Sequence, residues 1–128
     1  MATQTTEGIK ISVETEYREE YSATKHSHFV FTYRITIENH SNYTIQLLRR
    51  HWHIYEADGS ISEVEGEGVV GQQPIIEPGA QHKYVSGCNL RTGIGKMKGT
   101  YLMERIIDGK RFHALIPEFS MLVPFRMN

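Results

Sequence analysis

Residues 29–39 read FVFTYRITIEN, and this stretch decides the fold class. Every second residue, from Phe29 to Ile37, is large and apolar, and the positions between them are mostly polar. Because successive side chains of a β-strand point to opposite faces, this period of two predicts a half-buried strand. The same alternation over 9–13 predicts a strand upstream, and a third is expected over about 45–57. No window repeats apolar residues at helical spacing for three turns, so no long helix is predicted.

Two Asp-Gly pairs, Asp58-Gly59 and Asp108-Gly109, predict tight hairpin turns with a strand on each side. The other strands are expected over 61–65, 81–86, 97–107, 110–116 and 119–123. About seven to nine short antiparallel strands in a single domain, residues 1–128, predict an all-β, immunoglobulin/fibronectin type III-like sandwich. Trp52, on the third of these strands, is the expected large core anchor.

Composition indicates an ordinary globular chain, with 39% hydrophobic and 23% charged residues. No apolar run approaches the ~18 residues of a transmembrane helix, and no signal peptide is visible at the N-terminus. Cys88 is the only cysteine, so no internal disulfide can form. We therefore expect a cytoplasmic protein.

The charge is divided along the chain although its net value is only −1. Residues 51–82 contain six acids and no Lys or Arg, whereas residues 83–111 contain seven Lys and Arg against two acids. Two differently solvated faces are the ordinary explanation of this division. Because no global field attracts polyanions, neither a nucleic acid nor a membrane is expected as a partner.

Gly66, Gly68 and Gly71 spell G-x-G-x-x-G, the letters of a dinucleotide-binding fingerprint. That fingerprint works only between a buried parallel strand and a helix whose N-terminus meets the pyrophosphate. Here a short hairpin strand precedes the motif, and residues 72–79 contain two prolines. Glu65 and Glu67 would also repel phosphate. We interpret the motif as structural, a loop that needs positive φ or a tight chain crossing.

His51 and His53 are separated by one residue, so on a strand they share a face and are candidate metal ligands. The sequence identifies no third ligand, although His82 or His113 are possible partners in space. The simpler interpretation is an exposed polar strand face, and no metal centre or cofactor is predicted. Cys88 has no adjacent histidine and is interpreted as a small buried side chain.

A basic stretch, residues 91–99, is the better candidate for binding chemistry. Arg91, Lys96 and Lys98 are expected on one glycine-rich loop, where cations and backbone N–H groups can hold an anion together. An ordinary solvated loop is the alternative interpretation.

Short motifs follow one another along almost the whole chain. They are Thr5-Thr6-x-Gly8-Ile9, Tyr33-x-Ile35-x-Ile37-x-Asn39, QLLRRHW at 46–52, EVEGEGVVGQQP at 63–74, Pro78-Gly79, Tyr84-x-Ser86-Gly87-Cys88, Met97-x-Gly99-x-Tyr101-x-Met103 and Ile116-Pro117-x-Phe119. In this order they resemble the ApaG family, also called DUF525. One departure is Gly93 after Thr92, where the family usually has proline.

The resemblance implies an immunoglobulin- or fibronectin type III-like sandwich and supplies no catalytic residues. The bacterial family takes its name from a genetic association with diadenosine tetraphosphate hydrolysis, and with magnesium and cobalt sensitivity. Related domains in eukaryotic F-box and polymerase-interacting proteins look like protein-binding modules. We therefore expect a non-enzymatic protein–protein interaction module, not an enzyme. The alternative is a sensor of small anions such as nucleotide polyphosphates, linked to diadenosine tetraphosphate metabolism or to magnesium and cobalt homeostasis. Its affinity for a phosphate-bearing ligand would be weak.

Overall fold

The computed structural model describes residues 1–124, which form nine β-strands and two 3-10 turns. In chain order these are β1 (Ala2–Thr6), β2 (Ile9–Tyr17), η1 (Glu19–Tyr21), η2 (Thr24–His26), β3 (Phe29–Asn39), β4 (Ile45–Glu56), β5 (Ile61–Glu67), β6 (Ile75–Ile76), β7 (Gln81–Leu90), β8 (Ile94–Arg105) and β9 (Arg111–Leu122). Within residues 1–124, no helix is long and apolar enough to cross a membrane.

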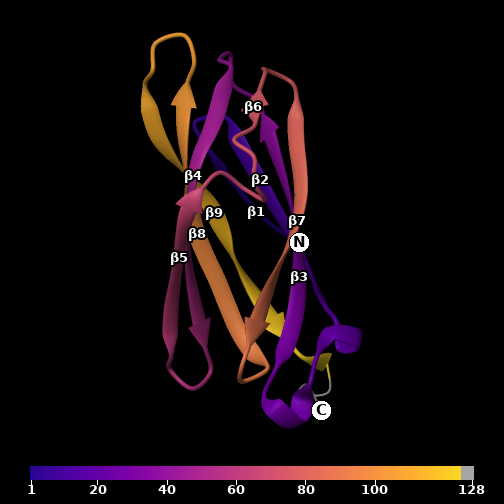
Figure 1. Cartoon of the computed structure of the whole chain (residues 1–128). Helices are drawn as coiled ribbons and strands as arrows, with labels where there is room; N and C mark the ends of the chain where they lie inside the picture. Colours follow the sequence, from indigo (N-terminus) through magenta and orange to yellow (C-terminus); the bar gives the residue numbers. More distant parts are fainter. Residues whose placement is uncertain (125–128) are drawn as a thin grey trace.

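The strands form two antiparallel sheets that pack as the two layers of a β-sandwich (Figure 1). One sheet has the order β1-β2-β3-β7, and the other has the order β5-β4-β8-β9, with β6 added to β4. The stretch 29–39 is β3, and it pairs with β2 on one side and β7 on the other. The all-β sandwich that the alternation predicts is confirmed.

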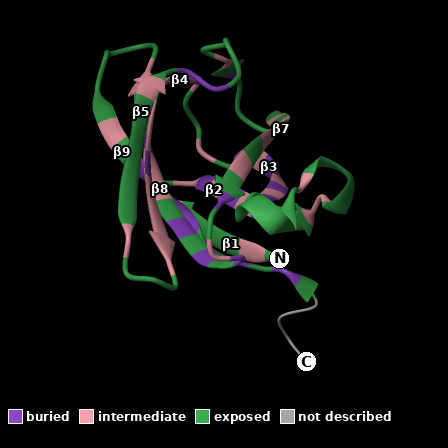
Figure 2. Cartoon of the chain, turned by 60° about the horizontal axis from the view of Figure 1, so that its bottom comes forward, coloured by how far each residue is buried: buried purple, intermediate pink, exposed green. Residues whose placement is uncertain are grey.

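The core lies between the sheets and is built by the alternating residues of the strands. The five apolar positions of β3, from Phe29 to Ile37, are at most 6% exposed. Figure 2 shows the same bands of buried and exposed residues along the strands. The second sheet contributes buried side chains that include Leu47, Met97, Tyr101, Met103, Ile116 and Met121.

Trp52 of β4 is 2% exposed and points into this core. Its ring packs edge-on against Tyr33 of β3, with centroids 5.5 Å apart, and against Phe119 of β9, with centroids 5.8 Å apart. The indole therefore joins both sheets and anchors β4, the strand whose other face carries the histidine pair.

The C-terminal strands are longer than the sequence predicts. The sequence predicts separate strands over 110–116 and 119–123, but β9 runs from Arg111 to Leu122 through both segments. The pairing of β8 with β9 shifts between Met97 and Gly99, so β9 carries an irregularity around Pro117. Proline has no N–H to donate to a ladder, and a bulge accommodates it without ending the strand.

The two Asp-Gly pairs both lie in hairpin turns, but the turns differ in length. In the β4–β5 hairpin, Glu56 N donates to Ser60 O at 3.0 Å, which leaves residues 57–59 in the loop. In the β8–β9 hairpin, Arg105 N donates to Lys110 O at 2.8 Å, which leaves residues 106–109. Neither turn is the two-residue type that Asp-Gly favours most.

Candidate functional site

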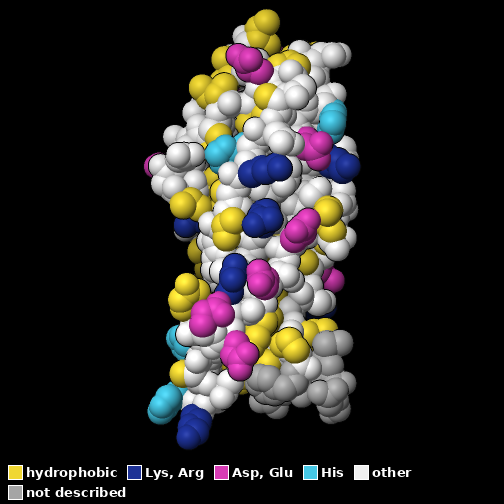
Figure 3. All heavy atoms as spheres, turned by 90° about the vertical axis from the view of Figure 1, so that its right-hand side faces the viewer, with side chains coloured by type: hydrophobic (Ala, Val, Ile, Leu, Met, Phe, Trp, Pro, Cys, Tyr) yellow, Lys and Arg dark blue, Asp and Glu magenta, His cyan; other side chains and the backbone are white. Residues whose placement is uncertain are grey.

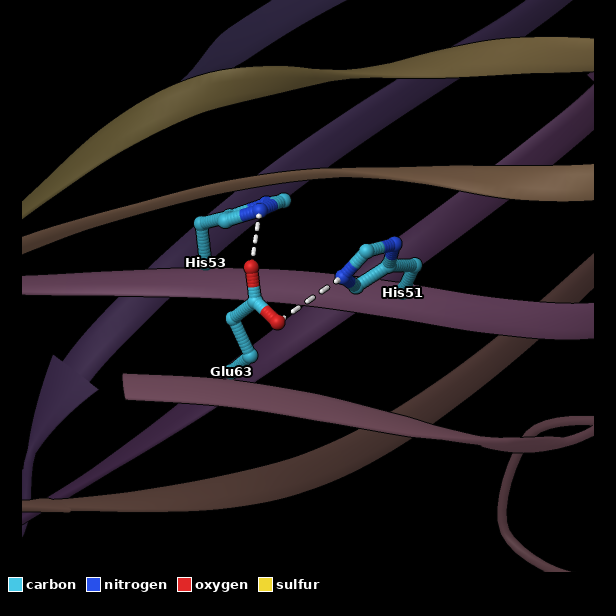
Figure 4. Close-up of side chains that lie close together, drawn as sticks. All are labelled: His51, His53 and Glu63. Atoms are coloured by element: carbon cyan, nitrogen blue, oxygen red, sulfur yellow. Dashed lines mark ion pairs between the residues drawn. The ribbon is translucent and has the colours of Figure 1, made fainter. Parts of the chain in front are cut away.

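The outer face of β4 presents two neighbouring histidines. Because side chains alternate along the strand, Trp52 points inward and His51 and His53 point outward. Their imidazole centroids are 4.5 Å apart, and the side chains are 34% and 31% exposed. Figure 4 shows the two imidazoles on either side of the Glu63 carboxylate.

Glu63 of β5 lies between the two imidazoles. The register pairs His53 with Glu63 directly, and His51 with Glu65. Glu63 Oε1 is 2.9 Å from His53 Nε2, and Glu63 Oε2 is 3.8 Å from His51 Nε2. One donor atom from each of the three residues lies within 4.8 Å of the other two. Two imidazoles and one carboxylate therefore converge on one point, which is a set of metal-ligand types.

Sequence reasoning missed Glu63 because the partner of His53 depends on the hairpin register. A two-residue Asp58-Gly59 loop would place Val64 opposite His53 and turn Glu63 to the other face. The three-residue loop shifts the pairing by one position. Asp58 fixes this loop, since its Oδ1 accepts hydrogen bonds from Ser60 N at 2.9 Å and Ser60 Oγ at 2.7 Å. The Asp-x-Ser spacing was the available signal.

Glu65 contacts the other side of the His51 ring. Its Oε1 is 3.1 Å from His51 Nδ1. The opposite nitrogen, Nε2, is buried and has no hydrogen-bond partner in the part of the chain that the structure describes. His51 thus faces a carboxylate with one nitrogen and directs the other, unpartnered, toward Glu63.

The other two histidines that the sequence offered as ligands do not join this group. His113 of β9 lines a shallow hollow that also contains His51 and Glu65, but it is outside the close donor set. His82 lies on β7 in the opposite sheet, beside Tyr84. Burial lowers the pKa of His82, because desolvation disfavours its charged form.

The basic stretch is not the loop that the sequence predicts. β8 begins at Ile94, so Lys96 and Lys98 lie on a strand and only residues 91–93 form the turn. The glycines that indicated a loop have another role. A Cβ at Gly95 would come 2.8 Å from Tyr55 O, and one at Gly99 would come 2.2 Å from His51 O. These glycines permit a close approach of β4 to β8.

The N–H groups of this turn already hold a carboxylate of the protein. Arg91 N and Thr92 N donate to Glu56 Oε1 at 2.7 and 3.0 Å, and Thr92 Oγ1 donates to the same oxygen. Lys96 and Lys98 lie over the Tyr55 ring, 5.8 and 5.5 Å from its centre. The expected anion site is therefore reduced to two neighbouring surface lysines, because the backbone N–H groups of the turn already donate to Glu56.

The G-x-G-x-x-G motif forms the exit from β5, with each glycine meeting a steric demand. Gly66 leaves room for the Arg50 guanidinium, which donates to the carbonyls of Glu67 and Gly68 at 3.0 and 3.1 Å. Gly68 has φ +62°, and a Cβ there would come 2.1 Å from Gln72 O. Gly71, with φ +75°, closes the turn. The Arg50 contacts and the positive φ angles of this turn are structural reasons for the three glycines.

The tip of the β8–β9 hairpin is apolar and exposed. Ile107 is 83% exposed and Ile106 is 48% exposed. Tyr43, in the turn between β3 and β4, is 42% exposed, and the Arg105 guanidinium lies 4.1 Å from its ring centre. Ile106 N donates to Thr44 O at 3.0 Å, which joins the hairpin to that turn. We call residues 43, 105, 106 and 107 the apical patch.

Cys88 of β7 is half-buried and has the environment of a structural thiol. Burial, with a smaller contribution from the Glu56 carboxylate, raises the pKa of the thiol to about 11. The thiol is therefore protonated at neutral pH, and the thiolate is the nucleophilic form of cysteine.

Comparison with known proteins identifies the family. The profile of the ApaG domain matches residues 19–105, which is more than half of the chain. The chain belongs to the ApaG family. It is 48% identical to Protein ApaG of Pseudomonas paraeruginosa over 91% of both chains. Protein ApaG of Brucella suis is 45% identical over 97% of this chain and 95% of its own. Among solved structures, the ApaA protein of Bordetella pertussis is 39% identical, with a TM-score of 0.87 over 91% of this chain and 94% of its own.

Proposed function

We propose that this ApaG-family chain is a non-enzymatic protein–protein interaction module that docks a partner through the apical patch. The exposure of Ile107, 83%, is the observation that carries the proposal. Exposed aliphatic side chains beside a Tyr–Arg pair have the composition of interface hot spots, in which a few anchors supply most of the affinity. The partner is a protein with an apolar depression that receives Ile106 and Ile107.

The patch is held in place before any partner arrives. Arg105 bonds to Asp108 across the turn, and Lys110 N donates to Asp108 Oδ1 at 3.1 Å. On the neighbouring turn, Asn39 Nδ2 donates to Tyr43 O at 2.8 Å. A fixed loop loses little conformational entropy on binding, so its contacts contribute more to affinity. The fibronectin type III-like sandwich acts in this proposal as a rigid support for loops.

The charges of the molecule favour a protein over a nucleic acid as the partner. Figure 3 shows the side of the molecule with β7 and β3, where Lys and Arg are interspersed with Asp and Glu. Lys10, Arg34 and Lys83 share a shallow hollow there with Glu14 and Glu38. Nucleic-acid grooves need clustered positive charge.

The single cysteine of the chain, Cys88, is a free thiol. A free thiol suits a reducing cytoplasm, and we propose that the protein works there.

Anion sensing is the weaker candidate function. It would rest on Lys96 and Lys98, since the Arg91 and Thr92 N–H groups donate to Glu56. Lys96 is also 3.8 Å from Glu118. Surface contacts of this kind contribute about 0–1 kcal/mol each and are screened by salt.

Affinity capture from the native cell tests the interaction proposal. Wild-type protein and the Ile106→Ser/Ile107→Ser variant are used as baits, and captured proteins are quantified by mass spectrometry. We expect one or more proteins whose capture falls about tenfold or more in the double variant, because loss of a hot spot costs at least that much affinity.

Ile61→Ser supplies the matched control. Ile61 is 63% exposed at the start of β5, so it is a comparably exposed isoleucine in the other Asp-Gly hairpin. Capture of the same proteins should be unchanged by this substitution. The proposal fails if Ile61→Ser reduces capture as much as the double variant, or if no captured protein depends on the apical patch.

A further inference from the structure

The Nε2 atom of His51 is the starting point, because it is buried without a hydrogen-bond partner among residues 1–124. It lies 3.8 Å from Glu63 Oε2. In the tautomer whose Nδ1–H faces Glu65, the Nε2 lone pair faces the Glu63 oxygen. A cation between these two acceptor atoms would bind both of them.

The environment of His51 matches that of a metal-bound histidine. Its Nδ1 lies 3.1 Å from Glu65 Oε1. In metal sites, the nitrogen that does not bind the metal usually faces a carboxylate or a carbonyl, which fixes the tautomer and raises the basicity of the ligating nitrogen. Glu65 thus orients His51 so that the Nε2 lone pair, the metal-binding atom of the ring, faces Glu63.

The distances suit a small tetrahedral ion. Zinc lies about 2.0–2.2 Å from nitrogen and oxygen ligands, so neighbouring ligands are roughly 3.4 Å apart. The Glu63 oxygens are 2.9 Å from His53 Nε2 and 3.8 Å from His51 Nε2, on either side of that value. Small side-chain rotations would bring both distances to the zinc-site value, because all three side chains are partly exposed and free to move.

We propose that His51, His53 and Glu63 bind a borderline divalent cation of the zinc class, with Glu65 as a positioning residue. Two imidazoles and a carboxylate prefer such ions to Mg²⁺ and Ca²⁺, which take oxygen ligands. Three protein ligands leave the fourth tetrahedral position open to water or to a donor from a bound molecule. The site is on the sheet face and is independent of the apical patch.

Neighbouring positive charges oppose the ion. Arg49 and Arg50 line the hollow that contains His51 and Glu65. Lys98 of β8 is directly across from His53, on the other side from Glu63. Its Nζ lies over the Tyr55 ring at 5.5 Å, which keeps it beside the site and not within it. Removing this charge with Lys98→Met should strengthen cation binding severalfold, since a like charge nearby weakens it.

Zinc titration of the untagged protein by calorimetry is the test. We expect one Zn²⁺ per chain and no measurable binding of Mg²⁺. His51→Ala, His53→Ala and Glu63→Gln should each weaken Zn²⁺ binding by about 100-fold, and Glu65→Gln by about 10-fold, as loss of an outer partner does. Circular dichroism checks that each variant keeps its fold.

His113→Ala and His82→Ala are the matched controls. Both remove an imidazole outside the donor set, and both should leave Zn²⁺ binding at the wild-type value. Imidazole ¹⁵N spectra of the wild type give a direct second measurement, in which the Nε2 signals of His51 and His53 shift on Zn²⁺ addition. Binding that survives in His51→Ala and His53→Ala, or that His113→Ala abolishes, overturns the proposed site.

Discussion

The β4–β5 and β8–β9 hairpins contain the same Asp-Gly dipeptide but expose different kinds of side chain, polar and ionisable in the first and aliphatic in the second. The β4–β5 hairpin presents histidines and glutamates along its length, with Asp58 at its turn. The β8–β9 hairpin presents Ile106 and Ile107 at its tip. In one hairpin the candidate site lies on the strand face, where register decides which side chains meet. In the other it lies in the loop, where register has no part.

The loops explain this difference. Residues 57–59 form a short turn that sets the pairing of β4 with β5. Residues 106–109 form a longer turn in which Asp108 bonds to Arg105, leaving the two isoleucines directed outward. The three-residue turn holds only Ala57, Asp58 and Gly59, whereas the four-residue turn contains two exposed isoleucines. Loop length and composition therefore separate a site built by cross-strand pairs from one built by a loop.

The largest expected effect comes from removing the anchor that both hairpins share. Trp52 holds β4, which pairs with β5 on one side and β8 on the other. Trp52→Ala should reduce the free energy of unfolding by about 3–5 kcal/mol, the usual cost of deleting a buried large aromatic ring. Chemical denaturation measures it. His53→Ala, on the outward face of the same strand, should change it by less than about 1 kcal/mol. Equal effects of the two substitutions would contradict the packing described for Trp52.

The faces of the strands could be predicted from the sequence, and the partners across them could not. Alternation identifies the inward Trp52 and the outward His51 from β4 alone. Glu63 becomes a neighbour of His53 only through the register of β5, and a one-residue difference in loop length reverses that choice. Gly95 and Gly99 led to the incorrect prediction of a loop for the same reason. The sequence alone does not distinguish a glycine that admits a neighbouring backbone from a glycine in a loop.

Two single-residue deletions sharpen this point about register. Deleting Ser62 should move Glu63 to the inward face and bring Val64 opposite His53. We expect loss of Zn²⁺ binding and a decrease of about 2 kcal/mol in the free energy of unfolding, since Gly66 leaves its place beside Arg50. Calorimetry and denaturation measure the two effects.

Deleting Ala57 is the control, because it removes the same number of residues without changing the pairing. The loop becomes the two-residue Asp58-Gly59 type, and Glu56 still faces Ser60. Zn²⁺ binding should stay close to the wild-type value. The free energy of unfolding should change by about 1 kcal/mol, because the hydrogen bond from Ala57 N to Ile94 O is lost. If both deletions abolish Zn²⁺ binding, register is not what assembles the site.

The smallest expected effect separates the two turn aspartates by their pKa values. The Arg105 guanidinium, together with Lys110 N–H, lowers the pKa of Asp108 to about 2. Hydrogen bonds from the Ser60 hydroxyl and N–H also lower the pKa of Asp58. A carboxyl whose pKa is lower in the folded state adds stability above its unfolded pKa. For Asp108 that contribution is lost as pH falls from about 4 to about 2.

Carboxyl ¹³C titration should show that Asp108 deprotonates at a lower pH than Asp58. Arg105→Gln should move the titration midpoint of Asp108 toward the ordinary aspartate value and leave the midpoint of Asp58 unchanged. A common midpoint for both aspartates would mean that the Arg105 pair does not hold the β8–β9 turn.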